Sequence, residues 1–226
     1  MKHEWGFRTT KGIGNKFSEE FEVYGKPFLK DNLLYGGQVF DTANIQNSSM
    51  NGFPVITGNP RILSSHISGL SKVSGIAMIY YSVLSESAVV ADRGFVLSSE
   101  VRDSARVVEK ARISDVILCE GAVISGDAQV LGTEREPLWI GGNTFINTGV
   151  WSKAPLTFDC ESGFTVTESI YGYVSVGCIT NRISKFLSSG ERYLKILGFT
   201  ERDADEIREY VKYIRDYQLD EAWLYA

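Results

Sequence analysis

The chain has 226 residues, 43% of them apolar, and this is enough for one domain with a sizeable core. Its net charge of −5 argues against nucleic acid or an anionic membrane surface as a partner. The three cysteines, Cys119, Cys160 and Cys178, form no Cys-x-x-Cys pair, and His3 and His66 are the two histidines. We therefore expect a cytoplasmic protein with free thiols and no metal site, and we find neither a signal peptide nor a membrane span.

Residues 1–38 are mixed in character: they are rich in glycine, aromatic residues and charges. We expect an irregular or short-stranded cap here, because the open end of a stack of strands exposes a sheet edge that needs a cover.

A six-residue repeat begins near Val39 and continues to Val150. It is clearest in the stretch "DSARVVEKARISDVILCEGAVISGDAQVLG", which spans 103–132. An apolar residue is followed by three variable residues, a small residue and another variable one. The apolar positions are Val83, Val89, Phe95, Val101, Val107 and Ile113, and after a slip of one residue Leu118, Ile124 and Val130.

A helix cannot carry this pattern, because six residues rotate it by about 600° and place successive apolar positions on different faces. One long strand is excluded by the charges that lie between the apolar positions. Three short strands joined by corners close a triangular coil of about 18 residues, which is the hexapeptide type of parallel β-helix. The alternative is a β-rich sandwich in which alanine and valine recur by coincidence.

The triangular coil predicts which side chains lie above one another inside the prism. A bulge at 91–94 is also expected, because Arg93 falls where a small inward residue belongs and a buried charge is costly. The predicted columns are Val83 with Val101 and Leu118, Val89 with Val107 and Ile124, Phe95 with Ile113 and Val130, and the small residues Ser87, Ala105 and Ala122.

The pattern changes after Val150. Residues 151–178 favour short β segments, and 179–226 favour a helical hairpin and a tail. Thr180 is the expected N-cap of the first helix and Gly198 its end, and Thr200 caps the second helix. The apolar tail around Trp223 suggests docking onto another subunit.

Three sequence features carry a resemblance to a known family: the run "GAVISGDAQV", the stretch "PLWIGG" and the Gly177–Cys178 step before a helical hairpin. The chain resembles left-handed β-helix proteins of the hexapeptide acyltransferase superfamily. Its layout is similar to that of bacterial and phage proteins described as acetyltransferase-like. The resemblance covers most of residues 39–216. It implies left-handed coils and a homotrimer of parallel solenoids, neither of which the periodicity itself shows.

Many members of that superfamily bind acyl-CoA between neighbouring solenoids and use a coil histidine as general base. Residues 83–130 contain no histidine, so a catalytic role depends on His66; the alternative is an exposed or hydrogen-bonded loop histidine. Four cations could line one face and hold an anionic ligand such as a CoA phosphate or a nucleotide, or they form a solvated face balanced by acids. These are Arg93, Arg106, Lys110 and Arg112.

Three functions are compatible with these features. The first is a non-catalytic, trimeric β-helix protein without a cofactor that binds a host protein or a small anionic ligand in grooves between subunits, as a phage or prophage accessory factor. The second is a CoA-dependent acyltransferase that uses acetyl-CoA. The third is a structural oligomer, such as part of a virion.

Overall fold

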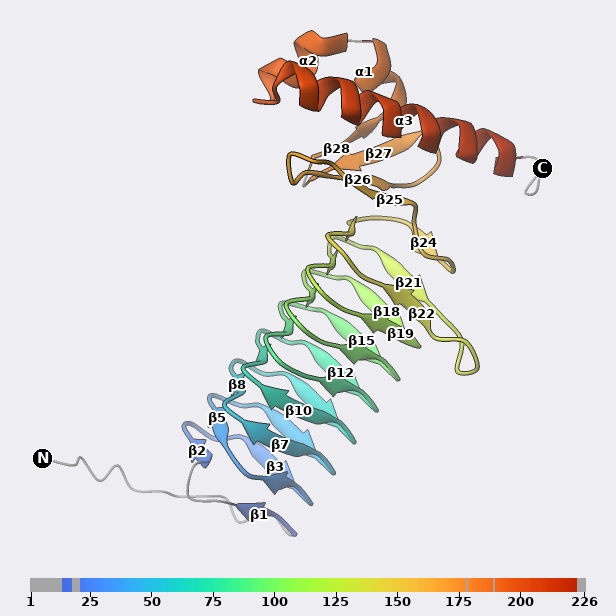
Figure 1. Ribbon diagram of the computed structural model, residues 1–226. Coiled ribbons are helices and arrows are strands. Elements are labelled where there is room, and N and C mark those ends of the chain that lie inside the picture. Colours follow the sequence, from blue (N-terminus) through green and yellow to red (C-terminus); the bar gives the residue numbers. More distant parts are fainter. Residues whose placement is uncertain (1–13, 18–20, 178, 189, 223–226) are drawn as a thin grey trace, which may run out of the picture.

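The computed structural model describes residues 14–17, 21–177, 179–188 and 190–222. The chain is mainly β, and most of it forms a parallel β-helix whose coils stack into a long prism (Figure 1). A smaller unit of antiparallel strands and helices lies at the C-terminal end of the prism, with one long helix running across it (Figure 1). No helix in the described ranges has both the length and the apolar character needed to cross a membrane.

Three parallel sheets of eight strands each form the sides of the prism. Sheet A contains β1 (Lys16–Phe17), β4 (Leu33–Leu34), β7 (Ser49–Gly52), β10 (His66–Gly69), β13 (Val83–Leu84), β16 (Glu100–Val101), β19 (Val116–Leu118) and β22 (Leu138–Ile140). Sheet B contains β2 (Phe21–Val23), β5 (Gly37–Val39), β8 (Val55–Ile56), β11 (Lys72–Val73), β14 (Val89–Val90), β17 (Arg106–Val107), β20 (Val123–Ile124) and β23 (Phe145–Ile146). Sheet C contains β3 (Phe28–Lys30), β6 (Asn44–Gln46), β9 (Arg61–Leu63), β12 (Met78–Tyr80), β15 (Phe95–Leu97), β18 (Arg112–Ser114), β21 (Gln129–Leu131) and β24 (Val150–Trp151).

Each regular coil is 17 residues long, one fewer than predicted. The fully buried residues of one coil, Leu84, Val90 and Val96, are six residues apart, but Val101 follows Val96 after only five. The slip seen once in the sequence therefore recurs at the corner between sheets C and A in each regular coil. This corner is shorter by one residue than the other two, which is why a count in strict sixes loses the register.

The predicted columns are confirmed where they begin at Val101, Val107 and Ile113. Val101 pairs with Leu118, Val107 with Ile124 and Ile113 with Val130. In the preceding coil the prediction is wrong by one position in each column. The inward residues there are Leu84, Val90 and Val96. The predicted residues, Val83, Val89 and Phe95, point outward. The small-residue column likewise contains buried Ala88 in place of Ser87.

The corner between sheets C and A contains a ladder of buried serines. Ser65 Oγ accepts a hydrogen bond from Ser82 N at 3.2 Å, and Ser82 Oγ accepts one from Ser99 N at 3.2 Å. The ladder continues from Ser99 Oγ to Val116 N at 3.1 Å. Each hydroxyl also donates to a carbonyl of its own coil, as Ser82 Oγ does to Tyr80 O at 2.6 Å. Buried N–H groups at this tight corner are thereby satisfied by the coil before.

Arg93 points into solvent as predicted, but no bulge is needed to turn it outward. Asp92 adopts a left-handed conformation, with φ of 59°, and Glu109 does the same one coil later, with φ of 60°. The turn at Arg93 is thus an ordinary corner of the coil. The predicted bulge was a consequence of the register error.

The β-helix begins earlier than predicted. Strands β1 to β5 lie within 16–39 and join the three sheets, so the expected cap over 1–38 is wrong for the described part of that segment. The first coils carry polar and exposed aromatic residues such as Tyr35 and Phe53, which obscure the repeat. Residues 1–13 lie outside the described residues.

The C-terminal unit consists of a four-stranded antiparallel sheet and three helices with a core of their own. Its strands are β25 (Thr157–Asp159), β26 (Thr165–Glu168), β27 (Tyr173–Val176) and β28 (Ile179–Arg182). Its helices are α1 (Ile183–Ser188), α2 (Gly190–Ile196) and α3 (Glu201–Ala222). Helix α3 packs on the sheet through buried Ile207, Val211 and Ile214.

The helix signals of this unit are confirmed in part. Thr180 is not an N-cap, because it pairs with Ser175 inside the sheet and the helix begins at Ile183. Gly198, with φ of 92°, follows the end of α2 as predicted. The Thr200 hydroxyl caps α3 by accepting a hydrogen bond from Asp203 N at 3.2 Å. The predicted tail around Trp223 lies outside the described residues.

Candidate functional site

The histidine predicted as a general base lies on the outer face of sheet A. His66 is the first residue of β10 and pairs with Ser49 and Val83 in the neighbouring strands, while the next residue, Ile67, points into the core. His66 Nδ1 is 2.6 Å from Ser49 Oγ. If Nδ1 carries the proton and donates it to Ser49, Nε2 is the free acceptor that a general base requires.

An open pocket of about 410 Å³ lies beside this histidine at the corner between sheets C and A. Its lining is rich in hydroxyl groups. Besides Ser49 and His66 it includes Asp31, Leu33, Ser64, Tyr81 and Val83. Such a cavity can hold a small polar molecule against the imidazole ring.

Two of the four predicted anion-binding cations lie together at the corner between sheets B and C. Arg93 and Lys110 occupy equivalent positions in successive coils, since Arg93 N donates to Glu109 O at 2.7 Å and Lys110 N to Gly126 O at 2.9 Å. They line a pocket of about 560 Å³ that also includes Asp92, Glu109 and Asp127.

Two of the three carboxylates of this pocket, Asp92 and Glu109, accept hydrogen bonds from the backbone. Asp92 Oδ2 accepts a hydrogen bond from Glu109 N at 3.2 Å, and Glu109 Oε2 accepts one from Gly126 N at 2.7 Å. These bonds turn both carboxylates along the axis of the prism and onto the next coil. Within the described residues Arg93 and Lys110 form no ion pair, although three acidic residues line the same pocket.

The other two predicted cations lie elsewhere. Arg106 is in β17 on the outer face of sheet B, between Val89 and Val123. Arg112 is in β18 on the outer face of sheet C, with its guanidinium 5.9 Å from the centre of the Phe95 ring. The four cations therefore form one pair and two separate positions.

An apolar strip on the outer face of sheet C was missed by the sequence analysis. It consists of Leu63, Met78, Tyr80, Phe95 and Leu97, on three adjacent strands and all partly exposed. The Tyr80 and Phe95 rings meet edge to face at 5.9 Å. The signal was a pair of apolar residues on either side of the inward Ile79 and Val96, but it is visible only once the coil length of 17 is known.

The three features are neighbours in the fold. The apolar strip occupies the face of sheet C, the Arg93–Lys110 pocket lies at the corner where the chain enters this sheet, and the His66 cavity lies at the corner where it leaves. The strip and the two pockets together form the candidate functional site.

Comparisons with known proteins find few similar to this chain. No family model matches the sequence, and no curated protein matches it. A crystal structure from Bacillus cereus, described as a "putative acetyltransferase", aligns with 88% of this chain and 98% of its own, at 11% sequence identity and a TM-score of 0.31. A likeness at this level says nothing about the activity of this chain.

Proposed function

We propose that the chain is a non-catalytic, trimeric β-helix protein that binds a small anionic ligand in grooves where its copies meet. The observation that carries the proposal is the apolar strip on sheet C, formed by Leu63, Met78, Tyr80, Phe95 and Leu97, with the Arg93–Lys110 pocket at its edge. The number three comes from the family resemblance. A role as a phage or prophage accessory factor, and a host protein as partner, stay predictions.

The strip supports association because it is apolar, contiguous and carried by a regular sheet. Covering apolar surface contributes about 25 cal/mol per Å², and contiguous apolar patches on a protein surface mark interaction sites. A second copy can present an equally regular face. When copies meet at this face, the adjoining corner with Arg93 and Lys110 becomes the wall of a groove.

The ligand we propose carries a phosphate group. Arginine and lysine bind phosphate oxygens through charge-assisted hydrogen bonds, which are stronger than neutral ones. A groove wall excludes water on one side of such a contact and strengthens it further. The aliphatic stems of Arg93 and Lys110 can meanwhile cover the apolar part of the ligand.

Calorimetric titration with CoA tests the proposed site at the Arg93–Lys110 corner. We expect CoA to bind the wild-type protein, and Arg93→Ala/Lys110→Ala to weaken binding at least tenfold, about 1.4 kcal/mol. Lys26→Ala/Lys212→Ala removes the same charge from exposed sites outside this pocket and is the control. Equal affinities of the two double variants would remove the corner from the proposal.

The geometry of one residue favours a second function, a CoA-dependent acyltransferase. The Ser49 hydroxyl orients the His66 ring, and the adjoining cavity can admit an acceptor molecule. Transfer of acetyl from acetyl-CoA to a panel of small amines and alcohols, with loss of transfer in His66→Ala, would establish this function in place of the non-catalytic one.

A further inference from the structure

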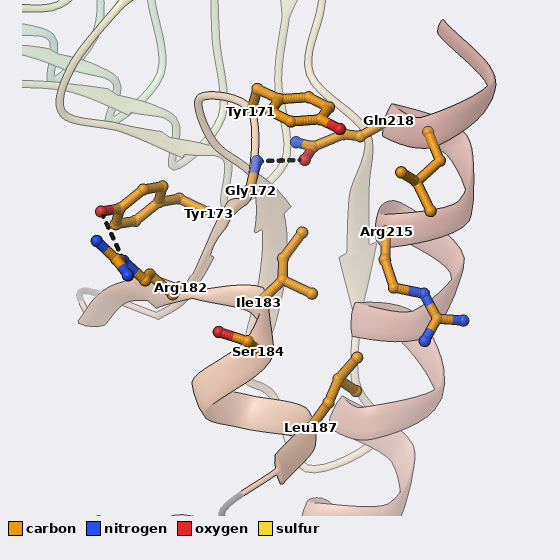
Figure 2. Close-up of a pocket in the computed structure, with 10 residues that line it drawn as sticks. Tyr171, Gly172, Tyr173, Arg182, Ile183, Ser184, Leu187, Arg215 and Gln218 are labelled. Atoms are coloured by element: carbon orange, nitrogen blue, oxygen red, sulfur yellow. Dashed lines mark hydrogen bonds between the residues drawn. The ribbon is translucent and has the colours of Figure 1, made fainter. Parts of the chain in front are cut away.

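A third pocket lies in the C-terminal unit, away from sheet C. It has a volume of about 510 Å³ and opens between β27, β28 and α1 on one side and α3 on the other (Figure 2). Its lining includes Tyr171, Arg182, Leu187, Arg215 and Leu219. The volume is in the range of small-molecule sites in proteins.

The lining of this pocket is mostly apolar. Ile183 and Leu187 come from α1 and face the space between α1 and α3 (Figure 2). Leu219 of α3 also lines the pocket. Leu219 is 55% exposed and Tyr171 is 64% exposed, so apolar surface at the rim is in contact with water. A ligand with a hydrocarbon body would cover this surface and gain the free energy of its burial.

Both charged side chains in the lining are basic, although one of them, Arg215, is paired with Asp216 next to the pocket. Two guanidinium groups flank the pocket, Arg182 from β28 and Arg215 from α3, and no carboxylate is among its described lining residues (Figure 2). Arg182 Nε donates to the Tyr173 hydroxyl at 3.2 Å, which leaves its terminal nitrogens for another acceptor. Arg215 bonds Asp216 through Nε and Nη2, which leaves Nη1.

The wall of the pocket is fixed in place by a buried glutamine. Gln218 Oε1 accepts a hydrogen bond from Gly172 N at 2.8 Å (Figure 2), and its Nε2 donates to Ser169 O at 3.1 Å. These bonds join the loop before β27 to helix α3. A wall that is formed before binding lowers the conformational entropy that a ligand must overcome.

We propose that this pocket binds an amphipathic monocarboxylate, a molecule with a hydrocarbon body and a single carboxylate. The body contacts Ile183, Leu187 and Leu219, and the carboxylate pairs with the guanidinium of Arg182 or Arg215. Arginine suits this role because its planar fork matches the geometry of a carboxylate. This site goes beyond the proposed function, since it shares no residue with the corners or with the apolar strip.

Titration of the full chain with decanoate, followed by calorimetry and by backbone amide NMR, tests this proposal. We expect one decanoate per chain and shifted amide signals at Gly172 and Leu219. Decanol, which lacks the charge, and acetate, which lacks the body, should each bind at least tenfold more weakly. Decanol binding as tightly as decanoate, or no decanoate binding at all, would overturn the proposal.

Single substitutions test which residues contact the carboxylate of the ligand and which contact its hydrocarbon body. At least one of Arg182→Ala and Arg215→Ala should weaken decanoate binding tenfold or more, whereas Arg202→Ala on the same helix as Arg215 should not. Leu219→Glu, at an exposed position, should also abolish binding, while Ile196→Glu, exposed and outside the pocket, should leave it unchanged. Wild-type affinity in both arginine variants would refute the proposed head-group contact.

Discussion

Two cysteines, Cys119 and Cys160, have their thiol pKa raised by their surroundings. Burial, together with the nearby carboxylates of Glu206, Asp203 and Asp159, raises the pKa of the Cys160 thiol to about 12. Burial also raises the pKa of Cys119, with a contribution from Glu120. Since the thiolate is the nucleophile, a raised pKa lowers the reactivity of both thiols near neutral pH.

Alkylation by iodoacetamide at pH 8 measures this directly. At that pH about one Cys160 in ten thousand is a thiolate, so we predict that Cys119 and Cys160 react far more slowly in the native protein than in urea. Site-resolved mass spectrometry separates them from Cys178. Labelling of native Cys160 at the rate found in urea would contradict the proposed burial.

At the scale of the element, the register of each short strand decides which side chains form the core. In β13, Leu84 is fully buried whereas the preceding Val83 is 40% exposed. The 18-residue coil expected from the sequence assigns these roles the other way round. The two coil lengths therefore differ in a property that substitution can measure.

Alanine substitution in β13 distinguishes the registers. We predict that Leu84→Ala lowers the free energy of unfolding by about 2–5 kcal/mol, because it leaves a cavity in a closely packed prism. Val83→Ala, one residue earlier, should change it by about 0.5 kcal/mol or less. Urea unfolding followed by circular dichroism gives both values, and a larger loss for Val83→Ala would contradict the 17-residue register.

The serine ladder lies at the shorter corner of the coil, between sheets C and A. Ser82 Oγ satisfies the buried N–H of Ser99, so we predict that Ser82→Ala destabilises the protein by about 1–3 kcal/mol. Ser87→Ala, at an exposed corner, serves as the matched control and should change stability by about 0.5 kcal/mol or less. Equal stability of the two variants, measured in urea, would show that the ladder bond contributes nothing.

The sequence predicts the type of fold well and its details less well, for identifiable reasons. Triangular coils follow from the six-residue spacing, and the exact stacking of Val107 on Ile124 follows with them. The five-residue step between Val96 and Val101 could not be recognised, because Phe95 is also apolar and fits a strict count in sixes. At Thr180 a good N-cap residue lies in a strand, since pairing with β27 outweighs local preference.

The sequence predicts individual residues of the candidate site but not how they are grouped in space. His66 and the four cations could be named from their side-chain chemistry, but which of them lie together depends on the register. Arg93 and Lys110 are neighbours because they are one coil apart. The apolar strip on sheet C and the pocket beside α3 were missed, since each combines residues from separate strands or helices.

The whole molecule combines two hydrophobic cores, one in the prism and one in the C-terminal unit. The prism has a continuous column of buried aliphatic residues, and the C-terminal unit has a separate core around Phe186 and Val211. Asn147 Nδ2 connects the two units through a hydrogen bond to Thr180 Oγ1 at 3.1 Å. Between them they offer an apolar face for association and a pocket for a small ligand.

The native mass of the purified protein, measured by light scattering, tests the association through sheet C most directly. We predict the mass of three chains for the wild type and of one chain for Leu97→Lys, which places a charge in the strip. Leu70→Lys, exposed at the corner between sheets A and B, should keep the wild-type mass. A single-chain mass for the wild type, or an unchanged assembly in Leu97→Lys, would contradict the account.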